Sequence, residues 1–222
     1  MEYGRLSAVL PSDGILNVPT EFFLIDDLPA EACYELRLDV NAHCKFALHL
    51  GRQGRKIRRQ VTFALCGTNS RLDAHVLIQA ATNQRIEWQG IQRHLVPDAN
   101  SNLLIKSIAG AGARVSITSK IIIDPLAVGS CAHFRNKNLV ISSRAHVIAR
   151  PELEIFANDV RCSHGAAIGG TDPAEEFYLR SRGIPPPAAK TILKRAFAEE
   201  ILRQIPDDDQ IIGPPNKIAN EY

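Results

Sequence analysis

Two residues in the last third of the chain have the types and the spacing that metal chemistry needs. Cys162 and His164 are separated by one residue and follow the alternating segment that ends at Ile155. In an extended strand, residues two apart face the same side, so a thiolate and an imidazole could share one ion. Sulfur and nitrogen ligands both suit iron and zinc. Two ligands leave a site incomplete, and a partner chain or further residues would have to supply the rest. The alternative is structural, with a buried cysteine beside a hydrogen-bonded histidine.

Two other constellations favour ordinary explanations. Cys131 and His133 repeat the Cys-x-His spacing, but their surroundings predict a loop or corner and favour coincidence. Glu152 and Glu154 could act as paired carboxylates in acid–base catalysis. Their alternation with apolar residues favours the solvent face of a strand instead. The sequence contains no GxSxG, Walker or GxGxxG motif, so we do not expect an enzyme.

Bulk composition narrows the class of protein. The chain has 222 residues, of which 45% are hydrophobic and 23% charged, which is typical of a globular domain. A net charge of +2 and an aromatic content of 6% do not favour nucleic-acid binding. Five cysteines at irregular spacing, without a CxxC pair, favour free thiols in the cytoplasm. We find neither an apolar run long enough to span a bilayer nor a signal peptide, and expect no membrane partner.

Most of the chain carries the two-residue period of β-strands. The alternation is clear from Tyr34 to Val40 and returns from Phe46 to Leu50. Further strand-like pieces lie at residues 61–65, 72–78, 86–91, 103–105, 115–123, 139–141, 147–148 and 153–155. Short strands at such spacing form sandwiches, barrels or solenoids. Asp13-Gly14 is the only Asn-Gly or Asp-Gly hairpin dipeptide, and this scarcity favours a β-solenoid.

The period changes to that of helices after Gly170. Asp172 and Pro173 are suited to begin one helix, and Gly183 to end it. The prolines at 185–187 open a second, amphipathic helix that runs toward Pro206. We therefore predict three parts: a β core over residues 1–170, a helical segment over 171–206, and a flexible tail over 207–222.

Three blocks of sequence strongly resemble the SufB/SufD family of iron–sulfur cluster assembly proteins. They are Arg150 to Ala166, Glu176 to Ile184 and Phe197 to Leu202, and the run from Arg135 to Ser142 is similar to the family's segment before the first of them. The blocks occur in the family's order and cover residues from about 100 to 206. The Cys-Ser-His-Gly block has the SufD form. The related SufB scaffold carries a cysteine at the position of Ala145 and a glutamate at the position of Gly165.

The resemblance implies a fold and an assembly. The fold is a mainly β, right-handed parallel β-helix (a β-solenoid) with a short C-terminal α-helical segment. The chain would be a subunit that supports cluster formation or iron entry at a dimer interface with a SufB-like chain or a second copy. A SufC-type ATPase would dock on the helical segment, at Phe177, Tyr178, Arg180, Arg182 and Phe197.

The resemblance also gives the predicted metal pair a role. Cys162 and His164 would meet a transient iron–sulfur cluster or iron at the interface, with no tightly bound cofactor. A cationic His164 would favour the thiolate of Cys162. Family members usually have an additional region before the β core, whereas the β pattern here begins almost at once, so we expect either a truncated or a minimal form that lacks this region. The competing hypothesis is a purely structural subunit without metal or cluster ligation.

Overall fold

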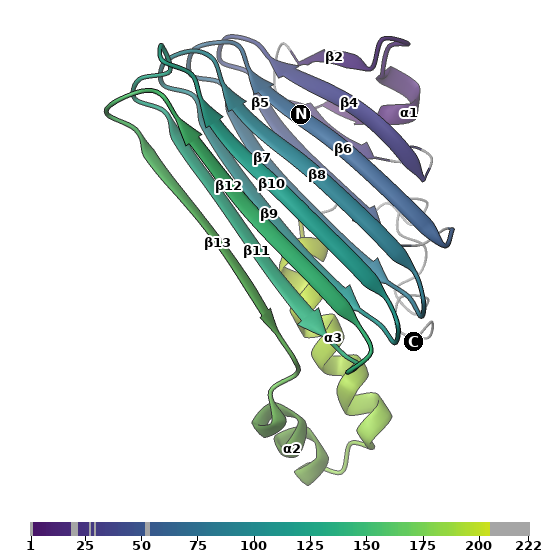
Figure 1. Cartoon of the computed structure of the whole chain (residues 1–222). Helices are drawn as coiled ribbons and strands as arrows, with labels where there is room; N and C mark the ends of the chain where they lie inside the picture. The colour runs from purple at the N-terminus through teal and green to yellow at the C-terminus, as the bar shows by residue number, and fades with distance from the viewer. Residues whose placement is uncertain (1, 19–21, 27, 29, 52–53, 205–222) are drawn as a thin grey trace.

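The computed structural model describes residues 2–18, 22–26, 28, 30–51 and 54–204, and it consists of two parallel β-sheets with helices at its C-terminal end (Figure 1). One sheet, here sheet A, contains β1 (Glu2–Arg5), β3 (Phe22–Asp26), β5 (His43–Leu50), β7 (Arg71–Ala80), β9 (Asn100–Ala109), β11 (Cys131–Val140) and β13 (Arg161–Gly169). The other, sheet B, contains β2 (Ile15–Val18), β4 (Glu31–Leu38), β6 (Lys56–Leu65), β8 (Arg85–His94), β10 (Arg114–Ile123) and β12 (His146–Ile155).

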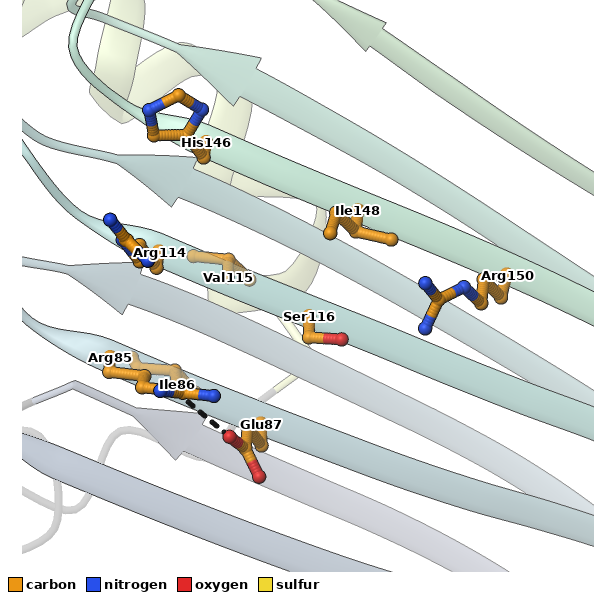
Figure 2. Close-up of a pocket in the computed structure, with 9 residues that line it drawn as sticks. All are labelled: Arg85, Ile86, Glu87, Arg114, Val115, Ser116, His146, Ile148 and Arg150. Carbon is orange, nitrogen blue, oxygen red and sulfur yellow. Dashed lines mark hydrogen bonds and ion pairs between the residues drawn. The ribbon is translucent and has the colours of Figure 1, made fainter.

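The chain alternates between the two sheets, so that each strand pairs with the strand two further along the sequence. One pass through both sheets is one coil of a parallel β-solenoid, as predicted. Residues that occupy equivalent places in successive coils become neighbours. Arg85, Arg114 and His146, for example, stand in one row across β8, β10 and β12 (Figure 2). Side chains far apart in the sequence therefore form continuous rows on the surface.

The core lies between the sheets and follows from the period-two pattern. Alternate residues are buried along strands such as β8 and β10, and Trp88 is the largest fully buried side chain among the described residues. Its indole N–H donates to the hydroxyl of Ser119 at 3.2 Å, in the next coil. Phe46 and Phe63 pack edge to face across the core, with ring centroids 5.2 Å apart. These contacts tie successive coils and both sheets into one core.

Corners with left-handed backbone residues connect the strands. Asn83 and Gly112 have φ of 59° and 70° at equivalent corners of adjacent coils. A Cβ on Gly112 would lie 2.2 Å from the side-chain oxygen of Asn83, so a larger residue here would strain the backbone and displace the Asn83 side chain. Each corner sends the chain into the opposite sheet, which explains why hairpin dipeptides are scarce.

The C-terminal helices are α2 (Pro173–Ser181) and α3 (Pro186–Leu202), and a short helix α1 (Leu6–Val9) lies near the N-terminus. Asp172 caps α2 as predicted, because its carboxylate accepts the backbone N–H of Ala174 at 2.8 Å. Helix α3 covers the outer face of sheet A, where Ala198 and Ile201 are buried. None of the helices in the described ranges is both long and apolar enough to cross a bilayer.

The structure corrects two local predictions. The pieces at 147–148 and 153–155 belong to one strand, β12. Cys131 and His133 do not lie in a corner but begin β11, because the register with β9 extends that strand. The small residues from Gly165 pair with β11 as part of β13. The predicted flexible tail at 207–222 lies outside the described residues.

Candidate functional site

The last coil of the solenoid is open, because β12 and β13 are the edge strands of their sheets. Inward-facing residues of the preceding coil, such as Ile117 and Ile121 on β10, are fully buried. Their counterparts on the last coil are only partly buried. Phe156 is 61% exposed and Ile168 52% exposed at this end. The described chain thus leaves apolar surface and an unpaired edge on each sheet at one end.

Cys162 and His164 lie on β13 at this open end. Their register partners on β11 are Ala132 and Phe134, which are both buried in the core. Cys162 and His164 therefore share the inward face of β13, as expected for an extended strand. Cys162 is partly buried against the core, whereas His164 is exposed. A chain that stacked on β13 would meet both side chains.

Burial controls the ionisation of Cys162. Partial burial raises the pKa of its thiol, and a backbone hydrogen bond from Ala132 opposes that rise only in part. The expectation that a cationic His164 favours the thiolate stays a prediction for the assembled interface. The thiol is protonated near neutral pH and would lose its proton on binding a metal ion.

The second Cys-x-His pair lies on the opposite, outer face of the same sheet. The sulfur of Cys131 is 3.2 Å from Nε2 of His133. Nδ1 of His133 is 2.6 Å from the hydroxyl of Ser163 on β13. This chain of contacts joins the outer faces of β11 and β13, and the sequence did not predict it. The two Cys-x-His pairs thus lie on opposite faces of adjacent strands.

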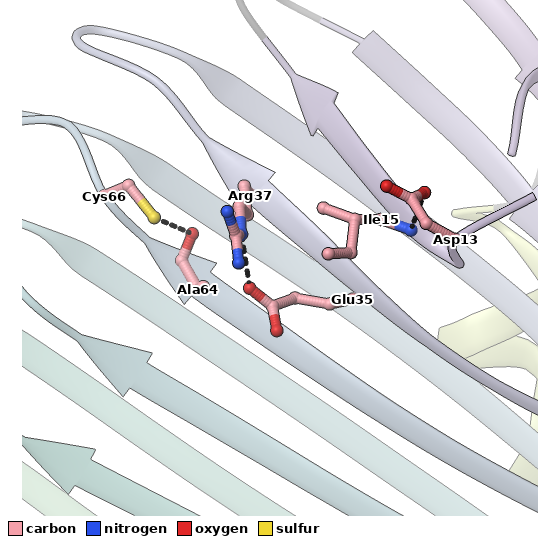
Figure 3. A network of polar contacts seen from close by, with 6 residues as sticks. All are labelled: Asp13, Ile15, Glu35, Arg37, Ala64 and Cys66. Atoms are coloured by element: carbon pink, nitrogen blue, oxygen red, sulfur yellow. Dashed lines mark hydrogen bonds and ion pairs between the residues drawn. The ribbon is translucent and has the colours of Figure 1, made fainter. Parts of the chain in front are cut away.

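The remaining cysteines have no such setting. All five cysteines are free, and the core residue Cys44 has a thiol whose pKa burial raises to about 12. Cys66 donates its thiol to the carbonyl of Ala64 at 3.6 Å, near the ion pair of Arg37 and Glu35 (Figure 3). Burial raises the pKa of Cys66 as well. In the described ranges, three or more His, Cys, Asp or Glu side chains nowhere form a group that could hold a metal ion.

The predicted docking residues fall into two groups. Phe177 and Tyr178 are 72% and 57% exposed on α2, a helix that buries none of its residues. Arg180 and Arg182 are also exposed, and the guanidinium of Arg182 lies 5.3 Å from the centre of the Tyr178 ring. Phe197 is different, because it packs inward on α3 against sheet A.

A groove of about 890 Å³ separates the end of sheet A from the two helices. Ile168, Tyr178 and Ile192 contribute exposed apolar surface to it. Such a groove, next to a helix without buried residues, is a candidate protein-binding surface. It connects the open edge at β13 with the exposed side of α2, so both candidate surfaces are at the same end of the molecule.

The family of cluster assembly proteins is identifiable from comparison with known sequences. Residues 33–197 match the family model described as "SUF system FeS cluster assembly, SufBD core domain". The iron–sulfur cluster assembly protein SufD of Escherichia coli is 33% identical over 155 residues, which cover 70% of this chain and 37% of that protein. The SufBD family protein slr0076 of Synechocystis is 43% identical over 110 residues, which cover 50% of this chain and 24% of that protein.

A third relative supports the same assignment. The SufBD family protein Rv1462 of Mycobacterium tuberculosis is 30% identical over 160 residues, which cover 68% of this chain and 40% of that protein. The matched part of each of these relatives is well below two thirds of its length. The matched region of this chain runs from β4 to α3 and includes Cys162 and His164. The chain therefore belongs to the SufBD family of iron–sulfur cluster assembly proteins, with its recognised core in the parallel β-solenoid.

Proposed function

We propose that this chain is a SufD-like subunit that supports cluster formation or iron entry at an interface with a SufB-like chain or a second copy. A SufC-type ATPase would bind its helical end and couple nucleotide turnover to changes at that interface. The open last coil, with Cys162 and His164 on its inward face, is the observation that carries the proposal.

The open end has the features that a second β-solenoid would complete. The edges of β12 and β13 present backbone N–H and C=O groups that can pair with another chain. Pairing there would also cover Phe156 and Ile168, which are exposed in the isolated chain. The same contact would enclose Cys162 and His164 between two proteins, where the partner could supply the missing ligands.

Iron or a nascent cluster would be cargo at this interface, with the thiol of Cys162 and the imidazole of His164 as its contacts. A Cβ on Gly165 would have no atom within 4 Å, so the fold leaves room for a larger side chain. Gly165 stands in register with Arg135 on the outer face of β13, so a side chain at this position would not share the face of Cys162 and His164. This chain would supply the accessory half of the site.

A purely structural subunit is the second candidate function. Its support is the partly buried thiol of Cys162, whose raised pKa favours the neutral form. In that case the chain would hold the complex together and position the ATPase through α2. The exposed Phe177 and Tyr178 serve both hypotheses equally.

Anaerobic reconstitution distinguishes the two functions. The chain would be purified together with SufB-like and SufC-type partners, and native mass spectrometry would establish the composition of the complex. Iron and sulfide would then be added, and the cluster measured by visible absorption per complex. We expect Cys162→Ser and His164→Ala to lower the absorption.

The chain offers a matched control for this experiment. Cys131→Ser and His133→Ala alter the same spacing on the outer face, and we expect both to keep the absorption of the wild type. If Cys162→Ser and His164→Ala assemble with the partners and reconstitute fully, the ligand role is wrong and the structural function remains.

A further inference from the structure

We propose that the outer face of sheet B binds a phosphate-bearing small molecule in a groove between β8, β10 and β12 (Figure 2). The groove has a volume of about 480 Å³, which is within the usual range for small-ligand sites. Arg114, Ser116, His146 and Arg150 line it. It is separate from the proposed cluster interface, because Cys162 and His164 face the inside of the solenoid.

Strand register gathers the cationic groups at this groove. Arg114 pairs in register with Arg85 on one side and with His146 on the other. Neighbouring strands are about 4.8 Å apart, so the three side chains form a short row across the sheet. Arg150 stands four residues further along β12, and its guanidinium points back over the groove toward Ser116 (Figure 2). The groove therefore has cationic groups at both ends and a hydroxyl on its floor.

These cations differ from the others on the same face. Most outward Lys and Arg side chains on the strands of sheet B have an acidic partner. The pairs are Arg37–Glu35, Lys56–Glu31, Arg58–Glu87, Arg85–Glu87, Arg93–Asp124 and Lys120–Glu154. Within the described part of the chain, Arg114 and Arg150 alone on this face have no carboxylate at ion-pair distance. Both of them line the one groove, where a bound anion would balance their charge.

The lining indicates the chemical class of the ligand. Guanidinium groups bind phosphate oxygens through paired hydrogen bonds, and the hydroxyl of Ser116 can add a further donor. The carboxylate of Glu87 is held 2.9 Å from Arg85 and leaves a net positive charge in the groove. Ile148 is 47% exposed beside Arg150 and offers an apolar wall to the organic part of a ligand. Inorganic pyrophosphate and AMP are suitable probes for these two features.

Isothermal titration calorimetry at low ionic strength tests the proposal on the full chain. We expect saturable binding of pyrophosphate, AMP or both, weakened about tenfold or more in Arg114→Gln and in Arg150→Gln. Arg93→Gln is the matched control, because it removes an equal charge from the same face where Asp124 already pairs with it. Thermal unfolding of each variant would show first that the fold is intact.

Comparison of the two probes shows which part of the ligand the groove recognises. Tighter binding of AMP than of pyrophosphate would show that the apolar wall contributes, whereas equal or tighter binding of pyrophosphate would show recognition of the phosphate groups alone. Three results would overturn the proposal. The first is that neither probe saturates at millimolar concentration. The second is that Arg114→Gln and Arg150→Gln bind as the wild type does. The third is that Arg93→Gln weakens binding as much as they do.

Discussion

Lys106 fastens helix α3 to the solenoid, and its replacement is the most direct test of how the helical end is held. Its ammonium group lies 2.7 Å from the carbonyl of Phe197 and 2.7 Å from the carboxylate of Glu200. It also lies 4.9 Å from the centre of the Phe197 ring. The Lys106 side chain is only 6% exposed, so these contacts are largely shielded from water. Lys106→Met keeps most of the side-chain volume and removes the charge.

The size of the effect follows from these contacts. A hydrogen bond to a charged group contributes about 1.5–3 kcal/mol. The ion pair contributes less than about 1 kcal/mol, since Glu200 is 43% exposed. Methionine recovers part of this loss through apolar contact with Phe197. We therefore expect the docking of α3 to weaken by about 2 kcal/mol.

Hydrogen exchange measured by mass spectrometry would detect this local change. A loss of about 2 kcal/mol predicts exchange at least about tenfold faster at the end of α3, near Ala198 and Ile201. Lys120→Met is the control, because Lys120 pairs with Glu154 on the outer face of sheet B and does not contact α3. Unchanged or slower exchange in Lys106→Met would refute the reasoning, since it would mean that burying the charge costs as much as its contacts contribute.

Three further predictions concern the solenoid itself. Gly112→Ala should lower the free energy of unfolding by about 1–2 kcal/mol because of its left-handed backbone, and by more because its Cβ would collide with Asn83. Urea unfolding measures this loss, and the control Gly165→Ala should show no comparable loss. Equal losses in the two variants would contradict the corner argument. Trp88→Ala should lower the free energy of unfolding by about 3–5 kcal/mol in the same assay, because it leaves a cavity in the core and removes the hydrogen bond to Ser119. A loss below about 1 kcal/mol would show that the core closes around the cavity. Burial lowers the pKa of His94 from 6.5 to about 4, so the unfolded chain binds more protons than the folded chain between these pH values. The free energy of unfolding should therefore fall by about 3 kcal/mol as pH drops from 6.5 to 4, which urea unfolding curves at a series of pH values would measure. An equally steep fall in His94→Gln would assign the effect to other groups.

Much of the fold could be predicted from local sequence patterns. Period-two alternation identified the strands, because one face of each strand must enter the core. Asp172 and Pro173 marked the start of α2, since capping depends only on residues close in sequence. The block around Cys162 and His164 pointed to the SufBD family, and the family match confirms that assignment. The strand pattern and the helix cap depend on residues close in sequence, which is why both could be predicted without the fold.

Contacts between residues distant in the sequence could not be predicted from local patterns. The contact of His133 with Ser163, the clamp of Lys106 on α3, and the row from Arg85 to His146 all join residues that are distant in the chain. The first and last of these depend on the register of parallel strands, and the Lys106 contact depends on how α3 packs against sheet A. Two Cys-x-His pairs with identical spacing consequently face opposite sides of sheet A. A pair's spacing fixes which of its members share a face, whereas only the packed solenoid decides whether that face meets core, solvent or a partner.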